Sequence, residues 1–142
     1  MKTAVPIAGG CVCGAVRYES SSKPLAMLAC HCRTCQMTSG GPYMPIVLFP
    51  ASAFKFTRGT PRYHTTDKLS GEKHRRGFCG ECGSRLTGAE TEGQAPRWVG
   101  VAAASLDDPS LFRSSANIFT SHAQAWDVMD ASLPKHPEYP PR

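Results

Sequence analysis

The stretch GGCVCGAVRYE, residues 9–19, combines a pair of cysteines with the beginning of a strand. Val16 and Tyr18 alternate with more polar neighbours, which is the pattern of a half-buried strand. Residues i and i+2 of an extended chain point to the same side, so Cys11 and Cys13 can reach one metal ion. The stretch therefore predicts a strand that carries two metal ligands at its start.

A second pair of cysteines lies in CGECG, residues 79–83. Cys79 and Cys82 have the C-x₂-C spacing of a zinc knuckle, and Gly80 and Gly83 tolerate the positive φ angles that such tight turns need. The two pairs are 66 residues apart (79 − 13). We predict that they form one closed four-thiolate site for a structural zinc ion, with Zn–S distances of ~2.3 Å.

Three further cysteines, Cys30, Cys32 and Cys35, lie in LACHCRTCQMTSGG, residues 28–41. They are too close together to be divided between distant metals, and three protein ligands with one open position are typical of a catalytic zinc. His31 should point away if the strand alternates. The remaining histidines follow no ligand spacing, although any of them could fold back as a fourth ligand: His64, His74, His122 and His136.

The remaining patterns predict a mainly β protein. Runs of apolar or alternating residues indicate strands at 14–20, 25–30, 43–49, 54–59, 61–66, 97–106 and 116–126. Short helical turns are expected at 35–39 and 107–112. We predict a single domain over residues 1–142, with a core of about 6–133 and a proline-rich tail at 134–142.

Composition and charge limit the classes of partner. No apolar run reaches the length of a membrane span and the N-terminus has no signal-peptide pattern, so we expect a cytoplasmic protein with no membrane partner. In a reducing compartment, seven cysteines favour metal binding over disulfides. Seven thiolates with two zinc ions add −3 to the formal charge of +5 and leave +2, so no nucleic-acid partner is expected. The basic run KHRRG, residues 73–77, is interpreted as a solvated strand or loop face.

Two other uses of the cysteines remain open at this point. An iron–sulfur cluster also takes cysteine ligands, but the CHCRTC spacing at 30–35 matches neither ferredoxin pattern. A redox role for either C-x₂-C pair lacks the usual βαβ context.

Three motifs taken together resemble the glutathione-dependent formaldehyde-activating enzyme family, whose domain also occurs in centromere protein V. They are GGCVCGAVRYE (9–19), CHCRTCQMTSGG (30–41) and GFCGECGSRL (77–86). The later stretches VGVAAASLDDP (99–109) and ANIFTSHAQAW (116–126) agree with the family's C-terminal part. The resemblance covers nearly the whole chain.

The resemblance implies an Mss4-like fold, in which twisted antiparallel sheets are stapled by a structural zinc. It also implies two zinc ions per chain, one on Cys11, Cys13, Cys79 and Cys82 and one at the active site on Cys30, Cys32 and Cys35. Family members are carbon–sulfur lyases, and the namesake joins glutathione to formaldehyde. The namesake enzymes are longer chains, so we expect the substrate to be a small thiol adduct, of the glutathione–formaldehyde type by family resemblance.

The chemistry of the three-cysteine site agrees with this implication. A substrate thiol at the open position would lose its proton, and its thiolate could attack a carbonyl carbon or leave when a C–S bond breaks. Arg33, Ser39 and Gly40 are our candidates for binding the substrate's carboxylate or carbonyl. The alternative is a zinc-stabilised binding or scaffold module without catalysis, in which the chain supplies a fourth ligand. The oligomeric state does not follow from the sequence.

Overall fold

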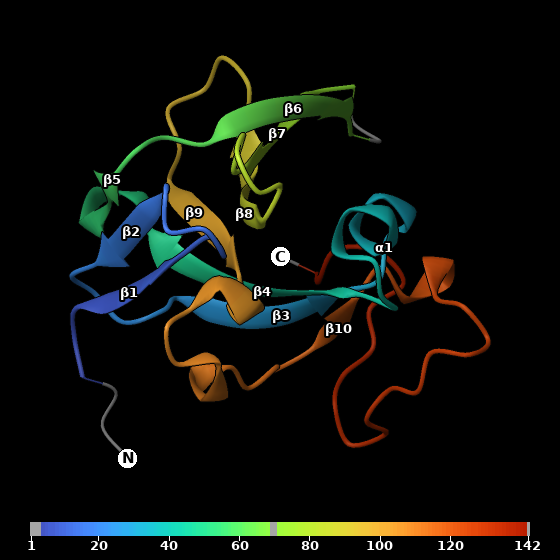
Figure 1. Cartoon of the computed structure of the whole chain (residues 1–142). Coiled ribbons are helices and arrows are strands. Elements are labelled where there is room, and N and C mark those ends of the chain that lie inside the picture. Colours follow the sequence, from blue (N-terminus) through green and yellow to red (C-terminus); the bar gives the residue numbers. More distant parts are fainter. Residues whose placement is uncertain (1–3, 69–70, 142) are drawn as a thin grey trace.

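The computed structural model describes residues 4–68 and 71–141, which form two β-sheets (Figure 1). The smaller sheet contains three antiparallel strands in the order β1-β2-β5. These strands are β1 (Ile7–Gly10), β2 (Arg17–Ser20) and β5 (Phe54–Arg58).

The larger sheet contains seven strands in the order β10-β3-β4-β9-β8-β7-β6. The strand β10 runs parallel to β3, and the other neighbouring pairs are antiparallel, so the sheet is mixed. The strand bounds are β3 (Ala26–Cys30), β4 (Met44–Pro50), β6 (Arg62–Asp67), β7 (Lys73–Phe78), β8 (Arg85–Thr91), β9 (Trp98–Ala102) and β10 (Asn117–Ile118).

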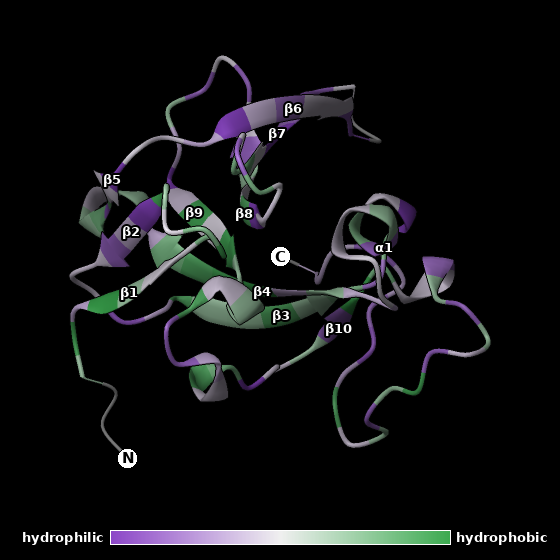
Figure 2. Ribbon diagram, in the orientation of Figure 1, coloured by the Kyte–Doolittle hydropathy of each residue, from purple (hydrophilic) through white to green (hydrophobic). Residues whose placement is uncertain are grey.

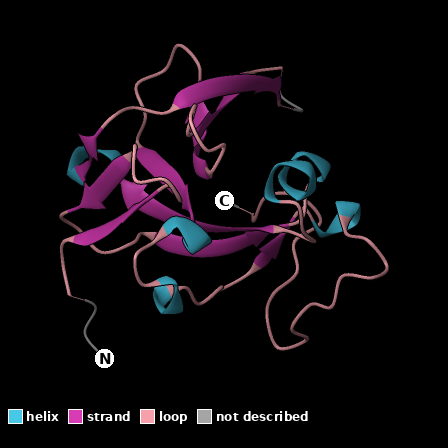
Figure 3. Ribbon diagram, viewed as in Figure 1, coloured by secondary structure: helices cyan, strands magenta, loops and turns pink. Residues whose placement is uncertain are grey.

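Helices are short and lie at the ends of strands (Figure 3). The α-helix α1 (Arg33–Ser39) follows β3. The 3₁₀ turns are η1 (Ala51–Ala53), η2 (Ala103–Ser105), η3 (Pro109–Leu111) and η4 (Thr120–His122). The prediction of a mainly β protein is confirmed.

Two predicted strands are much shorter in the structure. The strand expected at 97–106 ends at Ala102, where the chain turns into η2. The strand expected at 116–126 is reduced to β10, because Phe119 adopts a left-handed conformation with φ of 55° and directs the chain into η4. A residue with positive φ cannot continue an extended strand.

The main core lies between the two sheets. Tyr18 of the small sheet is completely buried together with Val47 and Phe49 of β4 and Leu86 of β8. Figure 2 shows apolar residues along β3, β4 and β9, whereas β6 and β7 are mostly polar. The buried cysteines pack against this apolar part of the larger sheet.

The C-terminal segment lies beside β10. Lys135 bridges Asn117 in parallel, and the N–H of Phe119 donates to the carbonyl of Glu138 at 3.0 Å. The ring of Tyr139 packs edge-on against Phe119, with 4.8 Å between the ring centroids. These contacts hold the C-terminal segment, up to residue 141, against β10 and Phe119. No helix formed by the described residues has the length and apolar character to cross a membrane.

Candidate metal centres

Two tight turns bring Cys11, Cys13, Cys79 and Cys82 together. The first pair follows β1 and the second lies between β7 and β8, so the cluster connects the two sheets. All four Sγ atoms lie within 4.8 Å of one another. Each turn ends at a glycine with φ of 78°, Gly14 after the first pair and Gly83 after the second. A side chain at φ above zero is strained, which explains why glycine ends both turns.

The spacing of these sulfur atoms fits a zinc ion. The Sγ atoms of Cys11 and Cys13 are 3.6 Å apart, and those of Cys13 and Cys79 are 3.8 Å apart. Four sulfurs placed tetrahedrally around zinc at ~2.3 Å would be about 3.8 Å from one another. A hydrogen bond with the Ser84 hydroxyl at 3.2 Å lowers the pKa of Cys82 to about 5, which favours the thiolate that a metal requires.

The second cluster is built where β3 passes into α1. Cys30 is the last residue of β3, Cys32 is the N-cap of α1 and Cys35 lies in its first turn. The backbone N–H of Cys35 donates to the Cys32 sulfur at 3.3 Å. The three Sγ atoms lie within 4.8 Å of one another, and we call them the trio.

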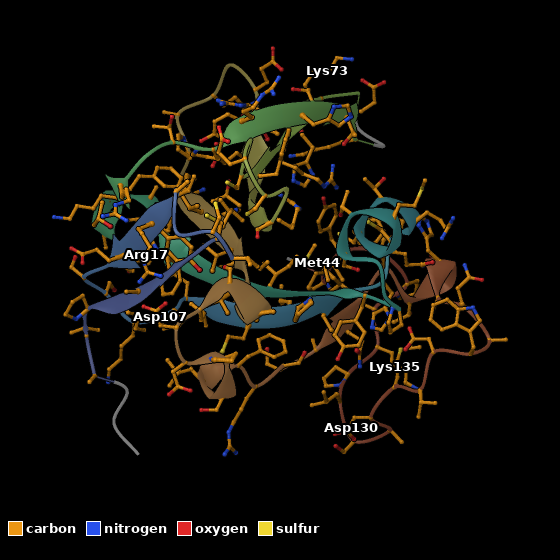
Figure 4. All side chains as sticks on the ribbon, viewed as in Figure 1. Arg17, Met44, Lys73, Asp107, Asp130 and Lys135 are labelled. Atoms are coloured by element: carbon orange, nitrogen blue, oxygen red, sulfur yellow. The ribbon has the colours of Figure 1, made fainter. Side chains whose placement is uncertain are left out.

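The trio packs against an apolar cluster and is mostly closed to solvent. Cys30 and Cys35 are buried, whereas Cys32 is partly exposed. Met44 is paired with Cys30 across β3 and β4 and belongs to the same apolar cluster; it is labelled in Figure 4. A ligand would therefore approach the trio from the side of Cys32.

Hydrogen bonds among the thiols separate their pKa values. Bonds from Cys30 and Cys35 lower the pKa of Cys32 to about 2, and the positive charge of Arg76 acts in the same direction. The bond with Cys32 raises the pKa of Cys30. Within the trio the thiolate is therefore favoured at Cys32, and a cation held by all three sulfurs would favour the thiolate form of the other two.

The described part of the chain offers no fourth ligand to the trio. Among the described residues, no ligand atom of a histidine, aspartate or glutamate lies within 4.8 Å of all three sulfurs. His122 Nδ1 accepts the N–H of Arg33 at 3.4 Å, and His74 Nε2 accepts the N–H of Ala89 at 2.9 Å.

His31 lies between two of the cysteines but points away from them. Its side chain is completely buried, with Nδ1 at 2.5 Å from Asp127 Oδ2 and Nε2 at 2.8 Å from Asn117 Oδ1. The side chain of Gln36 donates to the carbonyl of His31 at 2.7 Å. These contacts fix the backbone that carries Cys30 and Cys32.

The predicted substrate-binding residues have local partners. Arg33 Nη1 donates to Gln36 Oε1 at 2.7 Å along the surface of α1. Ser39 Oγ donates to the carbonyl of Gln36 and accepts the N–H of Gly41, and Gly40 caps the helix with φ of 74°. Ser39 and Gly40 therefore lie at the opposite end of α1 from Cys32. Their role in substrate binding, and that of Arg33, stays a prediction.

Sequence reasoning gave no role to two arginines near the trio. Arg76 of β7 is only 6% exposed, and Arg85 begins β8. The basic run at 73–77 was interpreted as a solvated face, and this interpretation is wrong for Arg76. The register of β7 against β8 shifts between Arg75 and Gly77, and such a bulge redirects side chains.

The chain is similar to known proteins in sequence and in fold. The family model described as "Glutathione-dependent formaldehyde-activating enzyme" matches residues 6–122. An uncharacterized lyase of Schizosaccharomyces pombe is 25% identical over 91 residues, which span 64% of this chain and 63% of that protein. The crystal structure of a Rhodobacter sphaeroides protein is similar in fold, with a TM-score of 0.55 and 22% identity over 75% of this chain and 96% of that chain.

Proposed function

Since this chain belongs to the glutathione-dependent formaldehyde-activating enzyme family, we propose that it is a carbon–sulfur lyase acting on a small thiol adduct. The proposal includes zinc on the trio at the active site. It also includes a structural zinc on the four-cysteine cluster and an Mss4-like fold. The lyase name of the Schizosaccharomyces pombe relative supports the reaction class. The adduct of glutathione with formaldehyde is the substrate that the family name suggests.

The observation that carries the proposal is the incomplete ligand set of the trio. Three thiols converge, Cys32 is partly exposed, and the described residues supply no fourth donor. Three protein ligands are typical of catalytic zinc sites, whereas four are typical of structural ones. The cluster of Cys11, Cys13, Cys79 and Cys82 has the four ligands of a structural site.

A zinc ion held by the trio would supply a positive charge that keeps a substrate sulfur in the thiolate form. The chain's own contribution is to hold the reacting sulfur in place and to limit water. Cys30 and Cys35 are buried against Met44, which leaves the side of Cys32 for the substrate. The buried contacts of His31 keep the two flanking cysteines in one conformation.

Metal analysis of single variants tests the proposal. The wild type is expected to contain two zinc ions per chain, and Cys35→Ser is expected to retain one, to stay folded and to lose activity. Activity is followed by NMR as formation and cleavage of the hydroxymethyl adduct of glutathione. Met37→Ser is the matched control, because Met37 lies on the same helix and is 74% exposed. A Cys35→Ser variant with two zinc ions, or with full activity, would contradict the assignment.

X-ray absorption separates the enzyme from a scaffold module. An exchangeable fourth ligand that is replaced by added thiol is expected for the enzyme. A second site closed entirely by protein ligands would instead indicate a binding or scaffold role.

A further inference from the structure

A buried arginine, Arg76, and a half-buried one, Arg85, lie on β7 and β8. Arg76 is 6% exposed, and its Nη1 donates to Thr66 Oγ1. Burial lowers the pKa of Arg85 to about 10, and its Nη1 donates to the carbonyls of Gly77 and Thr87. Both groups are therefore held in place by the sheet and still carry a positive charge at neutral pH.

These two charges have no acidic partner among the described residues. No carboxylate among residues 4–68 and 71–141 forms an ion pair with Arg76 or Arg85, and the Nε atoms of both are buried without a protein acceptor in that part of the chain. A water molecule can accept from an N–H, but it does not neutralise a buried charge. Burial, reinforced by the Arg76 charge, lowers the pKa of the adjacent His74 to about 4, so that side chain is neutral.

Arg85 lies on the sheet face that also carries the trio. Paired residues of neighbouring strands point to the same face, as do alternate residues of one strand. Cys30 pairs with Met44 of β4, and Leu48 lies on the same face of β4 as Met44. Leu48 pairs with Gly100 of β9, and Gly100 pairs with Gly88 of β8. Cys30 and Gly88 therefore lie on one face of the sheet. A Cβ atom at Gly88 would lie 2.7 Å from Arg85 Nη2, so the guanidinium rests directly on this glycine.

Electrostatic effects agree with this placement. The charge of Arg76 acts to lower the pKa of Cys32, and it opposes the overall rise in the pKa of Cys35. Cys35 in turn acts to raise the pKa of Arg85, which burial lowers overall. Burial raises the pKa of Tyr139, and the three cysteines and Arg76 also act on it.

We propose that Arg76 and Arg85 form an oxyanion site beside the trio, and that this site receives a carboxylate of the same molecule whose sulfur lies at Cys30, Cys32 and Cys35. This inference rests on the proposed function and restricts its substrate to thiol adducts that carry a carboxylate. A guanidinium pairs with the two oxygens of a carboxylate through parallel N–H donors. Because one molecule connects both groups, binding of the sulfur raises the effective concentration of the carboxylate.

Binding of small thiols to the zinc-loaded protein tests the inference by calorimetry. The probes are 3-mercaptopropionate and its neutral analogue 2-mercaptoethanol, with propionate and inorganic phosphate as thiol-free anions. The wild type is expected to bind 3-mercaptopropionate at least about tenfold more tightly than 2-mercaptoethanol, as charge-assisted hydrogen bonds allow. Arg76→Met and Arg85→Met should each remove most of this preference and leave binding of 2-mercaptoethanol within about threefold of the wild type. A response to phosphate equal to that to propionate would indicate a general anion site and overturn the carboxylate assignment.

Two further variants separate this role from a structural one. Gly88→Ala retains both arginines but moves the Arg85 guanidinium, and it should weaken 3-mercaptopropionate alone. Arg75→Met is the matched control, because Arg75 is adjacent on β7 and stacks on Tyr63 with 3.9 Å to the ring centroid. It should keep the full preference. If Arg76→Met or Arg85→Met does not fold, the wild-type ligand series and Gly88→Ala still decide the question.

The outcomes distinguish this inference from the proposed function. The oxyanion site would be overturned if the wild type bound the two thiols equally tightly. It would also be overturned if Arg76→Met weakened the binding of both thiols by the same factor. In the second case the arginines would only balance the charge of the cysteine thiolates. ¹⁵N-NMR of the Nε–H groups gives a readout independent of activity. The Nε–H signals of Arg76 and Arg85 could shift on addition of propionate while neither thiol binds. This result would support the oxyanion site and contradict the proposed function.

Discussion

Asp127→Ala is expected to destabilise the fold far more than an ordinary loop substitution. The side chains of His31 and Asp127 are 0% and 1% exposed and lie 2.5 Å apart. Asp127→Ala leaves the buried Nδ1 of His31 without its partner, which costs about 1–3 kcal/mol, and more where a charged group is involved. A domain of ordinary stability has about 5–15 kcal/mol in total, so the variant should unfold at a much lower denaturant concentration.

The measurement is urea unfolding followed by circular dichroism, with zinc and reductant held constant. Asp127→Asn retains an oxygen that can accept the Nδ1–H of His31, so it should lose only part of this stability. Asp130→Ala is the matched control on the same loop. Asp130 is exposed and bonds Ser132, and it lies at the edge of the molecule in Figure 4. Its unfolding midpoint should match that of the wild type.

A double-mutant cycle isolates the pair itself. His31→Ala with Asp127→Ala should be less destabilising than the sum of the single changes, because neither side chain of the pair then remains buried without the other. The reasoning is refuted if Asp127→Ala unfolds within about 0.5 kcal/mol of the wild type, or if the two changes are additive.

Four further substitutions give distinct expectations. Gly59→Ala adds a Cβ at 2.3 Å from the Ala15 carbonyl oxygen at φ of 59° and should cost about 2 kcal/mol or more in urea unfolding. Gly93→Ala, at φ of 80° with open space around it, should cost only about 1 kcal/mol, and equal losses would exclude the clash. Tyr18→Phe removes a buried hydroxyl at 2.5 Å from Ser105 Oγ and should cost about 1 kcal/mol, with no loss expected if that bond is unimportant. The pKa of His74 is lowered by burial to about 4, below its unfolded value, so it stabilises the fold above about pH 6.5 and this contribution is lost as the pH falls toward 4. His74→Gln should therefore flatten the pH dependence of unfolding in this window relative to the wild type, and parallel curves would contradict the assignment.

The division of the cysteines was accessible from the sequence because it depends on local spacing. Residues two or three apart can face one ligand wherever the chain later goes. The prediction that Cys11 and Cys13 begin a strand is wrong, because they lie in the turn between β1 and β2. Cys13 and Cys79 are 66 residues apart, but pairing them required no knowledge of the strand order. Once three of the seven cysteines were assigned to the trio, only the four cysteines at 11, 13, 79 and 82 remained to form a second site. The structure places the four sulfurs together as this argument requires.

The contacts that surround the trio were not accessible in this way. Asp127 reaches His31 across 96 residues through an irregular loop, and no periodic pattern predicts such a contact. Arg76 belongs to a basic run of the kind that normally faces solvent, and its burial depends on a shift in strand register. Arg85 rests on Gly88 of its own strand, and this arrangement depends on the absence of a side chain at that position.

The two cysteine centres differ in what they contribute to folding. The four-cysteine cluster connects Cys13 to Cys79 and thereby closes a loop of 66 residues between two sheets. The trio spans only Cys30 to Cys35, where the end of β3 and the start of α1 already fix the chain. Closing a long loop restricts the unfolded chain more than closing a short one, so zinc on the four-cysteine cluster should contribute more to stability. Ligand exchange at the trio can then occur in a folded protein, as a catalytic centre requires.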